Sequence, residues 1–155
     1  MTFDVRRGPA SVTFPLRQRI LRPHETLDQL ALPGDDDPDA GHFAAFADDA
    51  VIGTASVRRE PPPWQPDLAS GWRLRGMATA EGLRSTGVGT AALTAVIEHV
   101  GQHGGGLLWC NARMPAFEFY RRNGFTSRGD SWDDPVIGPH IVMERQVADR
   151  SARQG

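Results

Sequence analysis

The sequence predicts a single α/β domain built around a mixed β-sheet. Three observations support this prediction. The chain has 155 residues, no internal repeat or domain boundary interrupts it, and the expected elements follow in the order helix, hairpin, strand, helix, strand, helix and closing strands. A chain of this length buries a hydrophobic core without disulfide bonds. We expect one domain over residues 1–146 and a flexible tail over residues 147–155.

The first expected helix covers residues 10–22. Leu16, Ile20 and Leu21 recur there at helical spacing, with arginines between them. Pro15 stands near the start of this helix, where a missing backbone N–H costs little.

A loop, a hairpin and a second irregular segment follow. Residues 31–41 hold four aspartates, two prolines and two glycines, and the Asp-x-Asp-x-Asp-Gly order of a calcium loop is absent, which favours a solvated acidic loop over a calcium site. Residues 42–47 and 51–57 predict a β-hairpin around a turn at Asp48-Asp49. Residues 58–70 hold four of the 12 prolines and predict an irregular segment.

The strongest helix follows a strand in the middle of the chain. Residues 72–79 predict the strand and residues 87–103 the helix. Apolar side chains line one side of that helix: Val88, Ala91, Ala92, Ala95, Val96 and Val100. Three glycines at 104–106 end it.

The last third of the chain predicts strands on both sides of a short helix. Residues 107–110 form a short apolar strand, and residues 115–123 form the helix, which Gly124 ends. Residues 125–128 and 137–145 predict two closing strands.

The composition excludes several functional classes. The formal net charge is -2, which gives no electrostatic reason to expect a nucleic-acid partner. All 17 basic residues are arginine, and the lack of lysine excludes a Walker-type phosphate loop, Schiff-base chemistry and a kinase strand lysine. The single cysteine, Cys110, excludes an intrachain disulfide and a cysteine-based zinc site.

Targeting signals are not visible in the sequence. No apolar run reaches the roughly 18–20 residues that cross a bilayer, and the first ten residues, MTFDVRRGPA, lack the apolar stretch of a signal peptide. We therefore expect a cytoplasmic protein without a membrane partner.

The sharpest local signal is a glycine-rich loop before the strongest helix. Gly87 and Gly89 follow Arg84 in the order Arg-Ser-Thr-Gly-Val-Gly-Thr, and a helix start after such a loop points backbone N–H groups at an anion. A tight strand-to-helix turn is the alternative interpretation. A Rossmann dinucleotide site is excluded, because the glycine spacing differs and no second βαβ unit follows.

Several segments together resemble the GNAT superfamily of N-acetyltransferases. Arg84-x-x-Gly87-x-Gly89 is similar to that family's Gln/Arg-x-x-Gly-x-Gly/Ala signature. The strand Leu74–Thr79 leads into it, Asn111-Ala112-Arg113 ends the next strand, and the segment from Ala116 to Phe125 looks like the family's Ala-x-x-Phe-Tyr-x-x-x-Gly-Phe motif. With Trp109-Cys110-Asn111-Ala112-Arg113, the segment Gly138-Pro139-His140 also resembles a bacterial branch of the family.

The resemblance implies a mostly antiparallel sheet with splayed central strands flanked by helices, and acetyl-CoA as cosubstrate. It implies that the glycine-rich loop binds the pyrophosphate and that the strand before it binds the pantetheine through its backbone. The residues that it assigns to acetyl-CoA are Met77, Ala78, Thr79, Arg84, Ser85, Thr86, Gly87, Val88, Gly89, Thr90, Asn111 and Ala116. For Asn111, a turn-capping role is the alternative.

Two residues are candidates for proton transfer. The resemblance implies that Tyr120, the only tyrosine, protonates the leaving thiolate; packing of a tyrosine on the sheet is the alternative. His140 is a candidate base for the amine, or a binder of a substrate carboxylate; a surface or core histidine is the alternative. Glu118 lies on a different helical face from Tyr120, and we expect it to be solvated.

Other candidates have structural interpretations that we prefer. His99 and His103 have the i, i+4 spacing of a helical metal pair but no third ligand, and we expect no metal. Cys110 is expected to be a buried small side chain rather than a nucleophile. Arginines and tryptophans that could contact an acceptor, or only pack, are Arg73, Arg75, Arg113, Trp64, Trp72 and Trp132.

We therefore expect a GNAT-like N-acetyltransferase that moves acetyl from acetyl-CoA to a primary amine of a small molecule by direct attack. A protein or peptide amine is the second choice of acceptor. A non-catalytic acyl-CoA-binding sensor is the alternative from another functional class. A homodimer is compatible with the resemblance, although no apolar stripe in the sequence specifies an interface.

Overall fold

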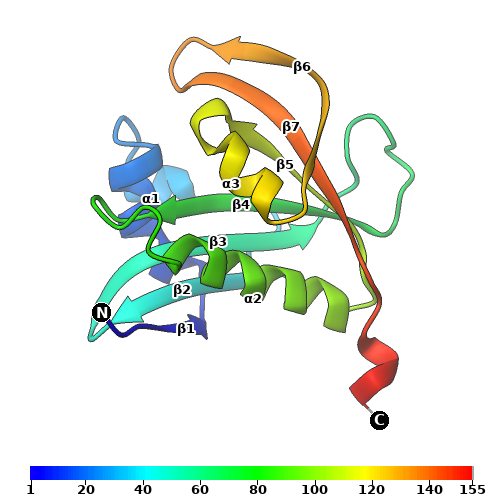
Figure 1. The fold of residues 1–155 in the computed structure, drawn as a ribbon, viewed down its shortest axis with the longest axis horizontal. Helices are drawn as coiled ribbons and strands as arrows, with labels where there is room; N and C mark the ends of the chain where they lie inside the picture. Colours follow the sequence, from blue (N-terminus) through cyan, green and yellow to red (C-terminus); the bar gives the residue numbers. More distant parts are fainter. Residues whose placement is uncertain (155) are drawn as a thin grey trace. The chain divides into compact units, whose positions relative to one another are not determined.

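The protein folds around a seven-stranded β-sheet with the strand order β1-β2-β3-β4-β5-β7-β6 (Figure 1). The structure is a computed structural model that describes residues 1–154. The elements in chain order are β1 (Asp4–Arg7), η1 (Ala10–Thr13), α1 (Phe14–Leu21), η2 (Leu27–Leu30), β2 (Gly41–Ala47), β3 (Ala50–Arg59), β4 (Gly71–Thr79), α2 (Val88–Gln102), β5 (Gly106–Arg113), η3 (Met114–Ala116), α3 (Phe117–Arg122), β6 (Thr126–Asp134), β7 (Gly138–Val147) and η4 (Ser151–Gln154). The predicted α/β class is confirmed.

The sheet is mostly antiparallel, as expected. β1 with β2, β2 with β3, β5 with β7 and β6 with β7 are antiparallel pairs, whereas β4 and β5 pair in parallel. The register of that parallel pair covers Gly71–Arg73 and Leu107–Trp109. The expected separation of the two strands beyond it stays a prediction.

Two compact units make up the chain. The first consists of Met1–Arg59 and Leu74–His99, and the second of Glu60–Arg73 and the segment that begins at Val100. Each unit has its own buried side chains, and we describe each by itself.

In the first unit, α2 packs across β2 and β3 (Figure 1). Val88, at the start of the helix, is fully buried with Ala45 of β2 and Ile52 of β3. Gly53 makes room for this contact, because a Cβ atom at that position would lie 2.6 Å from Cγ1 of Val88. The predicted apolar side of the helix is confirmed for Val88, Ala92, Val96 and Val100, which are buried. Ala91 and Ala95 are only half-buried, and Leu93 and His99 are buried in addition.

The first strand, β1, was not expected from the sequence. Asp4–Arg7 pairs with β2 in antiparallel register, from Asp4 opposite Phe46 to Arg7 opposite Phe43. Its side chains are exposed except for a half-buried Val5. An edge strand of this kind has no apolar alternation to reveal it, since backbone pairing rather than burial forms it.

In the second unit, β5, β7 and β6 form an antiparallel part of the sheet in the spatial order β5-β7-β6, and α3 packs on it. Tyr120 of α3 is buried, with its ring in edge contact with Phe119 at 5.2 Å and with Phe125 at 5.3 Å between ring centroids. Leu108 of β5 and Met143 of β7 are also fully buried in this unit. The short helix and both closing strands are therefore confirmed.

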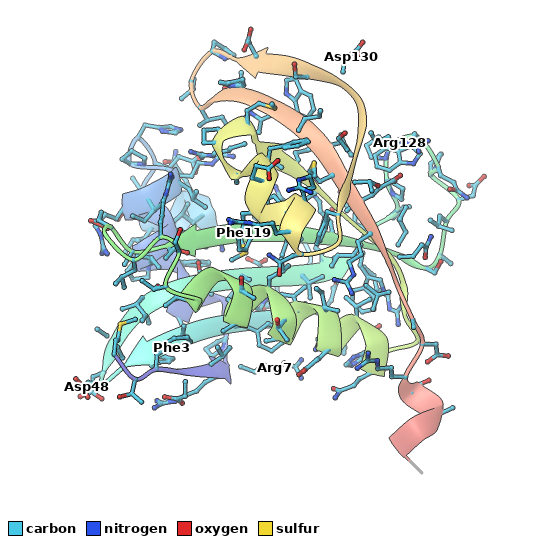
Figure 2. The ribbon with its side chains drawn as sticks, viewed as in Figure 1. Phe3, Arg7, Asp48, Phe119, Arg128 and Asp130 are labelled. Atoms are coloured by element: carbon cyan, nitrogen blue, oxygen red, sulfur yellow. The ribbon has the colours of Figure 1, made fainter. Side chains whose placement is uncertain are left out.

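The proline-rich segment of the second unit is irregular between β3 and β4, as predicted, and aromatic contacts fix it. Trp64 meets Trp109 edge to face at 5.8 Å between ring centroids. The guanidinium of Arg128, labelled in Figure 2, lies 4.6 Å from the centroid of the Trp64 ring. The indole N–H of Trp109 donates to the carbonyl of Glu60 at 2.9 Å.

The closing strands are longer than predicted. β6 continues past Arg128 to Asp134 after a register shift between Arg128 and Trp132. Its side chains are exposed along almost its whole length, so no apolar pattern marks this part. β7 includes Val147, and the N–H of Arg150 donates to the carbonyl of Gly101 at 2.8 Å. The last residue of the expected tail, Gly155, lies outside the described residues.

None of the helices within residues 1–154 is long and apolar enough to span a membrane.

A stability prediction follows from the thiol of Cys110, which is buried under Tyr120 in the second unit. Burial raises the pKa of Cys110 from 9.0 to about 12. Between pH 9 and pH 12 the thiol ionises in the unfolded chain but not in the folded protein. The stability that the protonated thiol contributes is therefore complete below pH 9 and is lost as the pH rises toward 12. The free energy of unfolding should therefore fall by about 1.4 kcal/mol per pH unit above pH 9 from this group.

The check is urea denaturation between pH 8 and pH 10, a range in which the tyrosine contributes little. Wild type should lose stability over this range, and Cys110→Ala should lose clearly less. Equal pH dependence in the two proteins would contradict the assignment.

Candidate active site

The glycine-rich loop of the first unit opens the helix α2. Ser85 has φ 64° and Gly87 has φ 91°, so the chain makes two left-handed steps just before the helix. The hydroxyl of Thr86 donates to the carbonyl of Leu83 at 2.5 Å and closes the turn. The first backbone hydrogen bond of the helix runs from Ala91 to Gly87 at 3.0 Å.

This loop presents its backbone to solvent. Arg84, Ser85, Thr86, Gly87 and Thr90 are exposed, whereas Val88 is buried and anchors the turn. The position of a Cβ atom on Gly87 has no neighbour within 4 Å among the described residues. Because the first N–H groups of a helix have no partner within the helix, they and the helix dipole can bind an anion at this point.

The end of β4 lies next to the start of α2. The position of a Cβ atom on Gly53 is 2.6 Å from Val88 and 3.6 Å from the carbonyl oxygen of Ala78, so both border the same glycine. Met77 and Thr79 are half-buried on either side of the buried Ala78. The structure therefore brings the predicted pantetheine strand and the predicted pyrophosphate loop together.

A glycine in the left-handed conformation precedes that strand segment. Gly76 has φ 60°, and its carbonyl accepts a hydrogen bond from the hydroxyl of Thr54 at 2.8 Å. A Cβ atom at Gly76 would lie 2.7 Å from Nε of Arg17. The guanidinium of Arg17 thus packs directly on the backbone of β4.

Arg17 is a candidate that the sequence analysis missed. It is buried on α1, one turn after the buried Thr13 and next to the buried Leu16. A charged residue at an inward position of an amphipathic helix is the signal that could have identified it.

In the second unit, Tyr120 and Cys110 share a side-chain hydrogen bond. Tyr120 is 5% exposed and Cys110 is 3% exposed. Burial raises the pKa of Tyr120 well above 10, and the neighbouring thiol adds to the rise. The phenol is therefore protonated throughout the neutral range, which is the state that a proton donor needs.

His140 of β7 is buried under an aromatic ring. It lies opposite Arg113 of β5 and opposite Trp132 of β6, and its ring stacks on that of Trp132 with centroids 5.7 Å apart and an interplanar angle of 22°. Nδ1 lies 2.7 Å from the carbonyl oxygen of Gly138. Because a carbonyl only accepts, Nδ1 carries the proton, and Nε2 has the lone pair when the ring is neutral.

The two further residues assigned to acetyl-CoA lie at one end of β5. Asn111 is exposed and stands opposite Val142 in the β5–β7 register. Ala116 is half-buried at the end of η3 and precedes α3. Glu118 is exposed and paired with Arg121 at 2.8 Å, so its expected solvation is confirmed.

The two histidines with the spacing of a helical metal pair have other contacts. His99 is buried, and its Nε2 lies 2.7 Å from the carbonyl oxygen of Asp39. His103 packs edge to face against Trp72 with ring centroids 6.1 Å apart. No group of three or more His, Cys, Asp or Glu side chains within residues 1–154 could hold a metal ion.

Comparison with known proteins identifies the family. The family model described as the acetyltransferase (GNAT) family matches residues 11–125. A protein of Bacillus subtilis (strain 168), described as the uncharacterized N-acetyltransferase YitI, is 36% identical over 135 residues, which cover 87% of this chain and 90% of that protein.

Solved structures share the fold at low sequence identity. ElaA of Escherichia coli has a TM-score of 0.72 and 18% identity over 93% of this chain and 99% of its own. The ribosomal-protein-S18-alanine N-acetyltransferase of Escherichia coli has a TM-score of 0.72 and 16% identity over 95% of each chain. An aminoglycoside 6′-N-acetyltransferase complexed with coenzyme A has a TM-score of 0.69 and 13% identity over 95% of this chain and 98% of its own. On the evidence of the family model and of the relative from Bacillus subtilis, this chain belongs to the acetyltransferase (GNAT) family.

Proposed function

We propose that this acyltransferase moves acetyl from acetyl-CoA to the primary amine of a small molecule by direct attack. The observation that carries the proposal is the buried Tyr120, whose hydroxyl stays protonated because it is buried beside Cys110. Acetyl-CoA is the donor that the GNAT family uses.

The state of Cys110 supports direct attack over a route through an acetylated cysteine. A nucleophilic cysteine needs an exposed or low-pKa thiolate. Cys110 is buried, its pKa is raised to about 12, and it is the only cysteine of the chain. The amine itself is therefore the nucleophile in our proposal.

The loop of Arg84–Thr90 binds the pyrophosphate in this proposal. Its exposed backbone, its two left-handed residues and the start of α2 support an anion site formed by N–H groups. Met77–Thr79 binds the pantetheine as an added strand would, and Asn111 and Ala116 add contacts to the cosubstrate.

The proton transfers balance as follows. The neutral amine nitrogen attacks the thioester carbonyl carbon, the carbon–sulfur bond breaks, and its electron pair stays on sulfur. The thiolate takes the proton of the Tyr120 hydroxyl, and the attacking nitrogen gives a proton to Nε2 of His140. The phenolate then regains a proton from solvent, and the imidazolium of His140 releases its extra proton to solvent, so both groups return to their starting states.

A peptide amine is the alternative acceptor. Solved relatives with this fold include one named for an aminoglycoside and one named for a ribosomal-protein alanine. The fold thus serves both kinds of acceptor, and the side chains around the acceptor decide between them.

Removal of the Tyr120 hydroxyl should slow turnover without weakening cosubstrate binding. Tyr120→Phe keeps the ring packed against Phe119 and Phe125 but removes the proton donor. Since general acid catalysis contributes typically 10²–10⁴-fold, kcat should fall by about 100-fold or more, while the Kd for acetyl-CoA changes little.

Steady-state kinetics and calorimetry check this prediction. Glu118→Gln is the matched control, because Glu118 is exposed on the same helix, and we expect its kcat to equal that of wild type. Unchanged kcat in Tyr120→Phe would exclude the acid role.

A carboxylate placed in the loop should prevent acetyl-CoA binding. Gly87→Glu puts negative charge where the pyrophosphate is proposed to lie, and it replaces a glycine of φ 91°. We expect the Kd for acetyl-CoA to rise by about 100-fold or more, equivalent to about 2.7 kcal/mol.

Gly82→Glu is the matched control. Gly82 has φ 78°, and a Cβ atom there also has no neighbour within 4 Å among the described residues. The two substitutions thus share backbone strain and charge and differ in position. Equal losses of affinity would show that strain rather than the anion site explains the effect.

A further inference from the structure

Arg17 is a buried cation without a buried counter-charge. It is 5% exposed, and its hydrogen bonds go to neutral oxygens. Nη1 donates to the hydroxyl of Thr13 at 3.1 Å, and Nη2 donates to the carbonyl of Leu30 at 3.3 Å. Within residues 1–154, no carboxylate forms an ion pair with this guanidinium. A buried charge of this kind costs free energy unless a partner compensates it.

The acidic residues around it have other partners. Glu25 lies 4.0 Å from Nη1 of Arg22, and a carboxylate oxygen of Asp35 accepts the N–H of Leu32 at 2.9 Å. Asp35 and Glu25 act on Arg17 only at longer range, and burial outweighs them and lowers the pKa of Arg17 below its ordinary value. The local chain therefore leaves the positive charge largely uncompensated.

One nitrogen of the guanidinium, Nε, makes no hydrogen bond with the described residues. Every side-chain nitrogen or oxygen that is fully buried in the described chain has a hydrogen-bond partner. Nε of Arg17 has no such bond among the described residues, so it is in contact with solvent. Nε and the neighbouring Nη form the edge with which arginine binds a carboxylate through two parallel hydrogen bonds.

This nitrogen lies on β4. Nε is 2.7 Å from the position of a Cβ atom on Gly76, and Gly76 is half-buried. The next three residues, Met77–Thr79, form the segment to which we assign the pantetheine. Only glycine leaves the space at this point, and a ligand at this part of the strand would meet the guanidinium.

We propose that Arg17 binds a carboxylate of the acceptor, so that the amine substrate is an amino carboxylate. The inference rests on the proposed acetyl transfer and names the chemical class of its acceptor. Thr13 and Leu30 hold the guanidinium in place, and the ring of Phe14, 5.4 Å away, covers its face. The acceptor carboxylate supplies the counter-charge that the chain lacks.

The alternative is that Arg17 only joins α1 and η2 to β4. The two roles differ in what a substitution changes. Substitution of an arginine with only a structural role would reduce kcat/KM for all acceptors equally and would lower the melting temperature. Substitution of an arginine that binds the carboxylate would change the preference between acceptors that differ only in this group.

The experiment uses three pairs of amines that differ by a carboxylate: L-phenylalanine and phenethylamine, L-leucine and isoamylamine, and L-lysine and cadaverine. Release of the coenzyme A thiol at saturating acetyl-CoA gives kcat/KM for each amine. For at least one pair, we expect the wild-type protein to prefer the carboxylate member by about tenfold or more.

Two variants and a control complete the test. Arg17→Met removes the charge, and Arg17→Lys keeps the charge but loses the planar fork. We expect both to reduce kcat/KM for the carboxylate member by about 10- to 100-fold and to leave the carboxylate-free member unchanged. Arg19→Met is the matched control, since Arg19 is exposed on the same helix and pairs with Glu81, and it should keep the wild-type preference.

Melting temperature and acetyl-CoA affinity show whether the variants are folded. If Arg17→Met does not fold, Arg17→Lys and the wild-type preference still decide. The inference is wrong if no pair shows a carboxylate preference in wild type, or if the preference persists in both Arg17 variants. If only the carboxylate-free amines support thiol release, the inference is contradicted and the proposed acetyl transfer still stands.

Discussion

The packing of Val88 onto Gly53 is the contact on which the proposed cosubstrate site depends. A fully buried valine at the first position of α2 fixes where the helix begins, and a glycine in β3 provides the space that no other residue would leave. The loop before the helix is exposed, yet its end is anchored in the core of the first unit. A flexible backbone is thereby held in one arrangement, which is what an anion site formed by N–H groups needs.

Burial has opposite consequences for two neighbouring side chains of the second unit. It raises the pKa of Cys110, which removes the thiol as a nucleophile, and it raises the pKa of Tyr120, which keeps the phenol available as a proton donor. Burial thus disfavours a cysteine nucleophile and keeps the phenol in its protonated form. Arg17 in the first unit is the reverse case, because burial leaves a cation in need of an anion.

The elements that carry an apolar pattern could be predicted from the sequence, and those that lack one could not. The hairpin, α2 and the short helix α3 bury regular sets of side chains, so their positions follow from spacing. β1 and the second part of β6 are exposed strands that exist through backbone pairing with a neighbour. Pairing between distant segments leaves no local signal.

The residues of the candidate site also fall into those that a local pattern predicts and those that only the packing of distant segments brings together. The loop at Gly87 could be predicted, because glycine spacing before a helix is local. The contact of Tyr120 with Cys110 depends on how α3 packs on β5, and the approach of Arg17 to Gly76 depends on how α1 packs on β4. The sequence shows Arg17 only as one of several arginines between the apolar residues of the first helix, and only the fold shows that it is buried.

The most direct test of direct acetyl transfer follows thiol release and the intact mass of the protein in one sample. The protein is mixed with acetyl-CoA first alone and then with a panel of small amines. The account predicts that the mass of the protein stays unchanged without amine, and that thiol release then requires an amine and yields the N-acetylated amine. An acetyl group on the protein that passes to the amine, or no thiol release with any amine, would contradict it.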